Sequence, residues 1–183
     1  MKFNVVITYE PGINNSDWVF SQLNSCIGTS YVVAKVRSSI ILLNVQDPYT
    51  FWYNLRVCID GKETPIHRII PVDEVVDPIV DKVAAIAREY ALKRIPIGAT
   101  FRITLHGHLY AVDERGRLVK MHSIDAIRVI AQDIDRKVDL KNPQWVIYVR
   151  SVSTRRWQKV AILSVARSYV FKNIRVAEIQ NPI

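Results

Sequence analysis

The sequence predicts an α/β protein of the α+β kind, organised as two domains over residues 1–73 and 74–183. Hydrophobic residues make up 49% and charged residues 23% of the 183 residues, which is typical of folded globular domains. Segments with the period of a strand alternate with segments that have the period of an amphipathic helix. The charge is divided unevenly: residues 1–73 hold six basic and six acidic side chains, so the whole formal charge of +8 falls on residues 74–183.

The first domain is predicted to contain four strands and two helices. Ser16 or Asp17 can cap the first helix and Gly28 can end it, whereas Asp47 followed by Pro48 starts the second, which ends near Gly61. The β-branched runs predict strands over residues 3–9, 31–36, 40–45 and 67–72. The order β-α-β-β-α-β is that of a ferredoxin-like unit.

Many RNA-recognition domains share this topology and hold bases on aromatic residues of their central strands. The central candidates here read Tyr-Val-Val-Ala-Lys-Val and Ile-Ile-Leu-Leu-Asn-Val, without a basic-Gly-aromatic signature. The first domain also has no net charge. The sequence therefore argues against RNA recognition by the first domain in this way.

The second domain is predicted to begin with a helix at Asp77-Pro78 that continues to Pro96. A strand over 101–105 follows, then a polar turn over 113–116 and a helix over 123–138. Residues 145–149 are continuously apolar, as in a strand covered on both faces, and 159–164 and 169–176 are further strand candidates. No linker separates the domains, so we expect the ferredoxin-like unit to pack against the second domain.

The two cysteines, Cys26 and Cys58, lie in apolar contexts. We interpret both as reduced core residues, with a single disulfide as the alternative. The chain begins with a strand-like run rather than a signal peptide, and no stretch approaches the roughly 18 apolar residues of a membrane span. These features predict a cytoplasmic protein.

Few residues suggest catalysis. His106, His108, His122 and Glu114 invite a metal site, and a strand through residues 106–108 would place the first two imidazoles on one face. No cysteine or second carboxylate joins them at a recognised spacing, and there is no nucleophile motif, phosphate loop or cofactor-binding signature. Asp133, Asp135 and Asp139 are interpreted as solvated or capping residues. We therefore predict no catalytic residues, no metal and no cofactor.

The region between Leu140 and Ala177 carries eight basic residues and no acidic one. Several of them surround a predicted turn that contains Trp157, and others alternate with Tyr169 and Phe171. Guanidinium groups bind phosphate through paired hydrogen bonds, and aromatic rings stack on unpaired bases, so this pattern predicts nucleic-acid binding. The alternative is a solvated basic rim with the three aromatic rings packed inward.

Residues 74–178 resemble a THUMP domain, the RNA-binding module of several tRNA-modifying enzymes. The similarity lies in residues 97–103, in the helix over 123–138 and above all in Val138-Asp139-Leu140-Lys141-Asn142-Pro143 before the strand 145–149. The resemblance implies binding of the tRNA acceptor end, and a ferredoxin-like unit commonly precedes THUMP. In the family's enzymes a catalytic domain follows, and we expect none in the space up to Ile183. The chain is therefore similar to the stand-alone branch, which includes an adaptor that presents tRNA to a cytidine acetyltransferase.

The family's basic surface corresponds here to Arg102, to the region from Lys120 to His122 and to the late basic strands. After the Asn-Pro element this sequence reads Val-Ile-Tyr-Val-Arg, where relatives often carry an acidic residue, and its Arg155-Arg156-Trp157 loop is its own. The sequence as a whole predicts a non-catalytic tRNA-binding protein that presents tRNA to a separate enzyme. The alternatives are an RNA-modifying enzyme subunit with a site near the three histidines and a basic scaffold for an acidic protein. The predicted RNA-binding residues are Arg102, Lys120, His122, Arg128, Lys141, Arg150, Arg155, Arg156, Lys159, Arg167, Tyr169, Lys172 and Arg175.

Overall fold

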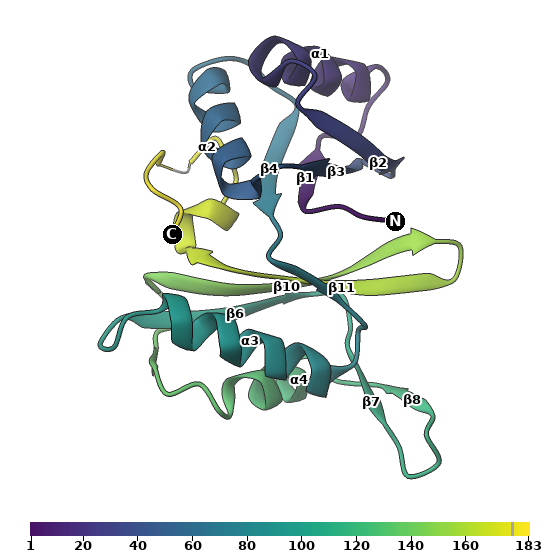
Figure 1. The fold of residues 1–183 in the computed structure, drawn as a ribbon, viewed down its shortest axis with the longest axis vertical. Helices are drawn as coiled ribbons and strands as arrows, with labels where there is room; N and C mark the ends of the chain where they lie inside the picture. The colour runs from purple at the N-terminus through teal and green to yellow at the C-terminus, as the bar shows by residue number, and fades with distance from the viewer. Residues whose placement is uncertain (177) are drawn as a thin grey trace. The chain divides into compact units, whose positions relative to one another are not determined.

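The computed structural model describes residues 1–176 and 178–183, and its contacts divide them into two units (Figure 1). Unit 1 consists of Met1–Val72 together with Tyr169–Ile183, and unit 2 consists of Asp73–Ser168. The expected division between residues 73 and 74 lies one residue from the observed one. The expectation that residues 169–183 belong to the second domain is wrong, because these residues contact unit 1.

Unit 1 has the predicted order of strands and helices. Its sheet is antiparallel throughout, with the order β2-β3-β1-β4. Strand β3 therefore separates the two strands of the β1-α1-β2 unit, and β1 separates those of the β3-α2-β4 unit, as in the ferredoxin-like arrangement. The elements are β1 (Val5–Tyr9), α1 (Asn15–Ile27), β2 (Tyr31–Arg37), β3 (Ile40–Val45), α2 (Pro48–Ile59) and β4 (Ile66–Pro71).

The second helix of unit 1 starts as its sequence predicts. The Asp47 side chain accepts a hydrogen bond from the Thr50 backbone N–H at 2.6 Å, and Pro48 occupies the first turn, where its missing N–H costs nothing. The prediction that Ser16 or Asp17 caps α1 is wrong. That helix begins at Asn15 with Asn14 at the N-cap position, and no side chain makes a capping hydrogen bond. Gly28 ends α1 with a φ of 69°, a conformation that favours glycine.

The two cysteines form a disulfide, which corrects the prediction that they are reduced core residues. Cys26 lies in the last turn of α1 and Cys58 in the last turn of α2, with Cα atoms 5.7 Å apart. Both side chains are only half-buried. The apolar residues next to each cysteine in the sequence belong to the buried faces of α1 and α2. Whether the two cysteines form a disulfide depends on how close the ends of these helices lie, and local sequence does not show this.

The C-terminal segment is not the predicted strand over 169–176. A short 3-10 helix, η1 (Ser168–Phe171), is followed by a turn. The segment is tied to unit 1 by backbone acceptors: Arg68 Nε donates to Phe171 O at 3.1 Å, and Arg56 Nη1 donates to Ile174 O at 3.0 Å. Ile174 N in turn donates to His67 O at 2.8 Å. Residues 169–176 are thus hydrogen-bonded to residues of α2 and β4 but do not form a strand of the sheet.

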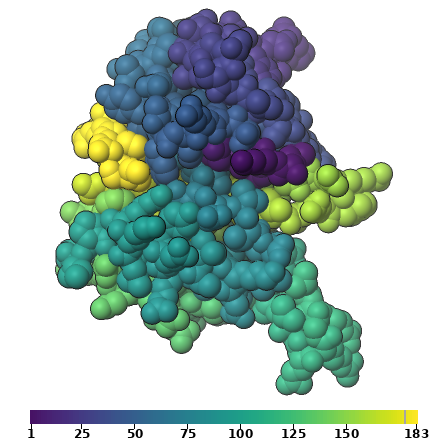
Figure 2. Space-filling model, viewed as in Figure 1, coloured from purple at the N-terminus to yellow at the C-terminus, as the bar shows by residue number. Residues whose placement is uncertain are grey.

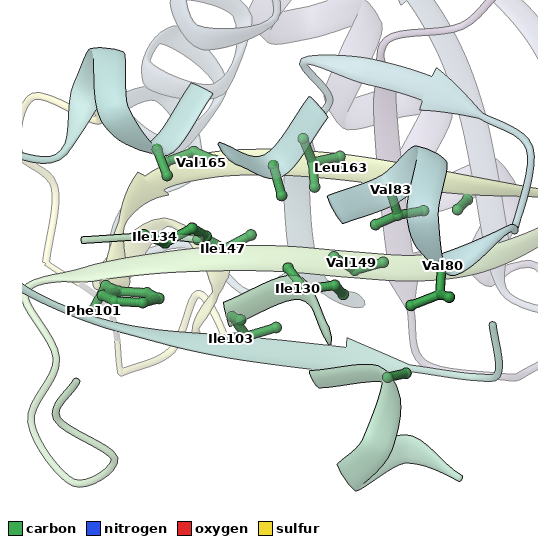
Figure 3. Packing of buried hydrophobic residues seen from close by; sticks show 14 of the residues in the cluster. Val80, Val83, Phe101, Ile103, Ile130, Ile134, Ile147, Val149, Leu163 and Val165 are labelled. Carbon is green, nitrogen blue, oxygen red and sulfur yellow. The ribbon is translucent and has the colours of Figure 1, made fainter. Parts of the chain in front are cut away.

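Unit 2 is a five-stranded mixed sheet with the order β5-β11-β10-β6-β9, covered on one face by two helices (Figure 3). Strand β6 runs parallel to β10 and β9, and the other pairs are antiparallel. Strands β7 and β8 form a separate two-stranded ribbon. The elements are β5 (Glu74–Val76), α3 (Val80–Arg94), β6 (Thr100–His106), β7 (Tyr110–Val112), β8 (Leu118–Lys120), α4 (Ser123–Ala131), β9 (Lys137–Val138), β10 (Trp145–Arg155) and β11 (Gln158–Arg167).

The core of unit 2 lies between its sheet and α3 and α4. Phe101 and Ile103 of β6, Ile147 of β10 and Leu163 of β11 point into this layer with Val83 of α3 (Figure 3). All five residues of Trp145–Val149 are buried, which confirms the prediction of a strand covered on both faces.

The predicted helix over 123–138 is too long. Helix α4 ends at Ala131, and the chain then turns into β9. Ile134 is nevertheless buried, whereas Val138 lies exposed in β9. The helical spacing of Ile134 therefore arises from a turn that returns its side chain to the core. None of the helices among the described residues is long and apolar enough to span a membrane.

Candidate nucleic-acid interface

The positive charge of the chain belongs mostly to unit 2. Unit 2 holds 17 of the 25 basic and 11 of the 17 acidic residues, which leaves a formal charge of +6, and unit 1 holds the remaining +2. A polyanionic ligand would therefore be attracted mainly to unit 2.

The first group stands at the tip of the long β10–β11 hairpin. Arg155, Arg156 and Lys159 are all exposed there, around a turn whose register shifts between Ser153 and Arg155. Trp157 is 91% exposed, so the alternative in which its ring packs inward is wrong. The guanidinium carbon of Arg156 lies 5.5 Å from the centre of the Trp157 ring. The tip thus presents three cations and one aromatic face to solvent.

The second group lies on the β7–β8 hairpin, whose turn is shaped by Asp113. The Asp113 carboxylate accepts hydrogen bonds from the backbone N–H groups of Arg115 and Arg117, at 2.9 and 2.8 Å. The side chains of these two arginines and of Lys120 are exposed to solvent. Sequence analysis predicted only a polar turn here and missed both arginines. The strand-like residues on either side of Asp113-Glu114-Arg115-Gly116 were the signal for a hairpin.

Both hairpins rise from the same end of the unit 2 sheet. In the parallel β6–β10 pair, His106 lies opposite Arg150, so the two strands leave the sheet together. Strand β6 continues through Gly107 into β7, and β10 continues into its own hairpin (Figure 1). Figure 2 shows the two hairpins standing out from the surface. We call this surface the two-hairpin end, defined by Arg115, Arg117, Lys120, Arg155, Arg156 and Lys159.

The histidines near this end do not form one cluster. Gly107, with a φ of 82°, ends the strand after His106, so His106 and His108 do not share a strand face as predicted. The His106 ring lies 5.2 Å from that of Tyr148, and His122 directly precedes α4. The described residues contain no group of three or more histidine, cysteine, aspartate or glutamate residues that could hold a metal ion.

Arg150 lies on the sheet rather than at the tip. It is half-buried, and its Nη1 is 3.4 Å from the Tyr148 hydroxyl. Its charge contributes to the base of the two-hairpin end, where it neighbours His106 across the parallel strands.

Three predicted residues lie at the opposite end of the same sheet. Arg102 donates to Leu140 O at 3.2 Å, and the Arg167 guanidinium lies 4.9 Å above the Trp145 ring. Lys141 is exposed in a turn held by Asp139, whose pKa is lowered because its carboxylate accepts hydrogen bonds from the backbone N–H groups of Asn142 and Lys141. The structure therefore separates these residues from the hairpin tip.

The remaining predicted residues lie elsewhere again. Arg128 is exposed on α4 and pairs with Asp125 at 3.6 Å. In unit 1, the Tyr169 hydroxyl donates to Asn181 O, its ring packs 6.2 Å from that of Trp52, and Lys172 is exposed. Arg175 lines a cavity of about 730 Å³ in unit 1 that is also lined by Arg56, Lys62, Glu10, Asp60 and Glu63. Mixed charge gives this cavity no clear preference for an anion.

The sequence of this chain matches no family model and no curated protein. Its fold does have solved counterparts. PH1313 from Pyrococcus horikoshii Ot3 superimposes with a TM-score of 0.58 at 16% identity, over 91% of this chain and 55% of that one. TrmN from Thermus thermophilus gives 0.56 at 15% identity, over 94% of this chain and 47% of that one.

A third counterpart is a 4-thiouridine synthetase in complex with RNA and with bound ATP. It gives a TM-score of 0.50 at 13% identity, over 92% of this chain and 42% of that one. At these identities the likeness establishes the fold. The chain spans about half the length of the proteins it resembles.

Proposed function

We propose that this chain binds tRNA through the two-hairpin end of unit 2, in the manner of a THUMP domain with a ferredoxin-like neighbour. The observation that carries the proposal is the gathering of six exposed cations on two hairpins that leave the sheet together. Support for RNA as the ligand comes from the sequence resemblance and from the solved counterpart described as a complex with RNA.

The chemistry of the two-hairpin end suits a phosphate backbone. Four of its six cations are arginines, whose planar guanidinium groups can each donate two parallel hydrogen bonds to a phosphate. Because these cations stand on projecting hairpins, neighbouring phosphates of one strand can reach several of them. Phosphate contacts of this kind release counterions, so affinity falls steeply as salt rises.

We further propose that the protein is not itself catalytic and presents the bound tRNA to a separate modifying enzyme, such as a cytidine acetyltransferase, while holding the acceptor region. The interruption of the strand at Gly107, which keeps His106 and His108 from sharing a strand face, supports this over the alternative of an enzyme site at these histidines and His122. The expected cytoplasmic location remains a prediction. The Cys26–Cys58 disulfide weighs against a reducing cytosol, where structural disulfides are rare outside hyperthermophiles.

Filter binding of tRNA tests the proposal. The charge-reversal variant R155E/R156E/K159E is compared with R88E/K93E/K137E, which lowers the formal charge by the same amount through exposed residues of α3 and β9 in the same unit, outside the two-hairpin end. If six phosphates are contacted, wild-type affinity should fall roughly 300- to 1,800-fold between 50 and 200 mM salt. The hairpin variant should nearly abolish binding at the lower salt, and the matched control should retain most of it.

Equal binding by the two charge-reversal variants would remove the two-hairpin end from the interface. Mass analysis of tRNA incubated with the purified protein alone addresses catalysis, since a modified nucleotide would establish an enzyme. If an acidic protein binds the two-hairpin end and excess tRNA fails to displace it, the scaffold alternative replaces the proposal.

A further inference from the structure

Trp157 occupies a backbone conformation that bulky residues avoid. Its φ is 70°, in the left-handed region, where the Cβ of an L-residue approaches the following carbonyl oxygen. The other described non-glycine residues with positive φ are Asn14, Ser38 and Ser39, which have small polar side chains. At the tip of a hairpin, glycine or asparagine is the residue expected in this conformation.

The fold of unit 2 gains little from the indole at this position. Trp157 is 91% exposed, whereas Trp52 and Trp145 are 1% and 4% exposed and pack in the cores of their units. A glycine in its place would relieve the backbone and leave the core untouched. The side chain is therefore displayed to solvent at the cost of local strain, which points to contact with another molecule.

The surroundings of the indole indicate which molecule. Arg156 lies beside the ring at 5.5 Å, Arg155 and Lys159 flank the turn, and the sequence has no acidic residue between Asp139 and Glu178. A flat aromatic face between cations matches a nucleobase between two phosphates. We propose that Trp157 stacks on an unpaired base of the bound RNA while Arg155, Arg156 and Lys159 hold the adjoining phosphates.

This inference rests on the proposed function and deepens it by naming the part of the RNA that the hairpin tip contacts. In an A-form duplex the base faces are covered by their neighbours, so an indole can stack only on a base that is unpaired or at an end. The cations recognise phosphate in paired and unpaired RNA alike. Trp157 should therefore determine the preference between the two.

The experiment compares two RNAs: a short duplex with an unpaired extension at its 3′ end, and the same RNA with that extension annealed to a complementary strand, so that every base is paired. Full-length W157G should bind the extended RNA about 5- to 160-fold more weakly than the wild type, the range measured for one stacked base. Its affinity for the fully paired RNA should fall by a much smaller factor, because only the duplex ends there offer an open base face. The thermal midpoint of W157G should be equal to that of the wild type or higher. W157F should restore part of the preference. W157N, which tolerates positive φ, separates loss of the ring from the change in backbone freedom.

Tryptophan fluorescence gives an independent signal. The emission of the exposed indole should be quenched by the extended RNA in the wild type and not in W157G. If W157G binds both RNAs as the wild type does, stacking is refuted, and the proposed function survives provided that binding remains salt-dependent. If the wild type binds neither RNA, the proposed function fails. A response of Trp157 to vesicles containing phosphatidylserine but not to RNA would overturn the inference in favour of a membrane surface, where tryptophan and arginine also gather.

Discussion

The disulfide between Cys26 and Cys58 should supply a large part of the stability of unit 1. It joins the last turn of α1 to the last turn of α2, so β2 and β3 lie within the closed loop. For the sequence separation of 32, the chain-entropy relation gives a contribution of about 3.7 kcal/mol to the free energy of unfolding at 25 °C. That is a large fraction of the 5–15 kcal/mol typical of a whole domain.

Urea unfolding followed by circular dichroism measures this contribution. Wild-type protein is compared with and without a reducing agent, and C26A/C58A is measured under both conditions. With an m-value of about 1–3 kcal/mol/M, reduction should lower the midpoint of unit 1 by roughly 1–4 M. Without reducing agent, C26A/C58A should already have the lower urea midpoint, and adding the reducing agent should not change that midpoint.

The double variant is the necessary control, because reductant acts only through the sulfur atoms. If wild-type protein unfolds at the same urea concentration under both conditions, the disulfide does not stabilise unit 1 by restricting the unfolded chain. A response of C26A/C58A to reductant would show that the effect has another origin.

Two further predictions concern the polar network on α3. Asp73 has only 3% of its side chain exposed and accepts hydrogen bonds from Arg94 Nη1 at 2.6 Å and from Val165 N at 2.8 Å. Because R94A would leave this buried carboxylate without its cation, it should lower the free energy of unfolding by about 3–5 kcal/mol. R88A, which removes an exposed arginine of the same helix, is the control and should be nearly neutral. Burial, followed by the hydrogen bond to Glu74 at 2.9 Å, raises the pKa of Tyr90 to about 12. Absorbance titration should therefore find a tyrosine that ionises near pH 12, and E74Q should lower the pKa of this tyrosine. Because the folded pKa lies above the ordinary value of 10.0, the stability from this interaction is fully present below pH 10 and lost as pH rises towards 12.

Much of the fold follows from local sequence because its elements have strong local signals. Asp47-Pro48 both predicts and caps α2, and the unbroken apolar run 145–149 predicts a strand buried on both faces. The failures occur where distant segments decide the structure. The sequence of residues 169–176 predicts a strand, yet Arg56 and Arg68 of unit 1 donate to backbone carbonyls of this segment across more than 100 residues of sequence.

The disulfide illustrates the same limit. The helix spacing around Cys26 and around Cys58 predicts each helix correctly, but whether the two thiols meet depends on how the ends of α1 and α2 are placed against each other. Leu23 and Leu55 are fully buried, and each cysteine lies three residues beyond, on the edge of its helix face where the two helices approach. A one-residue change in either position would turn the thiol away.

A run of like charge in a sequence is not the same as a charged surface, and the acid-free segment shows why. Its bases separate into the hairpin tip, the opposite end of the unit 2 sheet and the C-terminal segment of unit 1. The antiparallel pairing of β10 with β11 causes this separation. Because Trp145 pairs with Arg167, the end of β11 lies beside the start of β10, whereas Arg155, Arg156 and Lys159 lie at the hairpin turn at the other end of both strands. The parallel pairing of β6 with β10 then brings Arg115, Arg117 and Lys120 to the tip's end from a different part of the sequence. The candidate interface is therefore assembled by strand pairing, and a substitution that shifted the β10–β11 register would disperse it without removing a single charge.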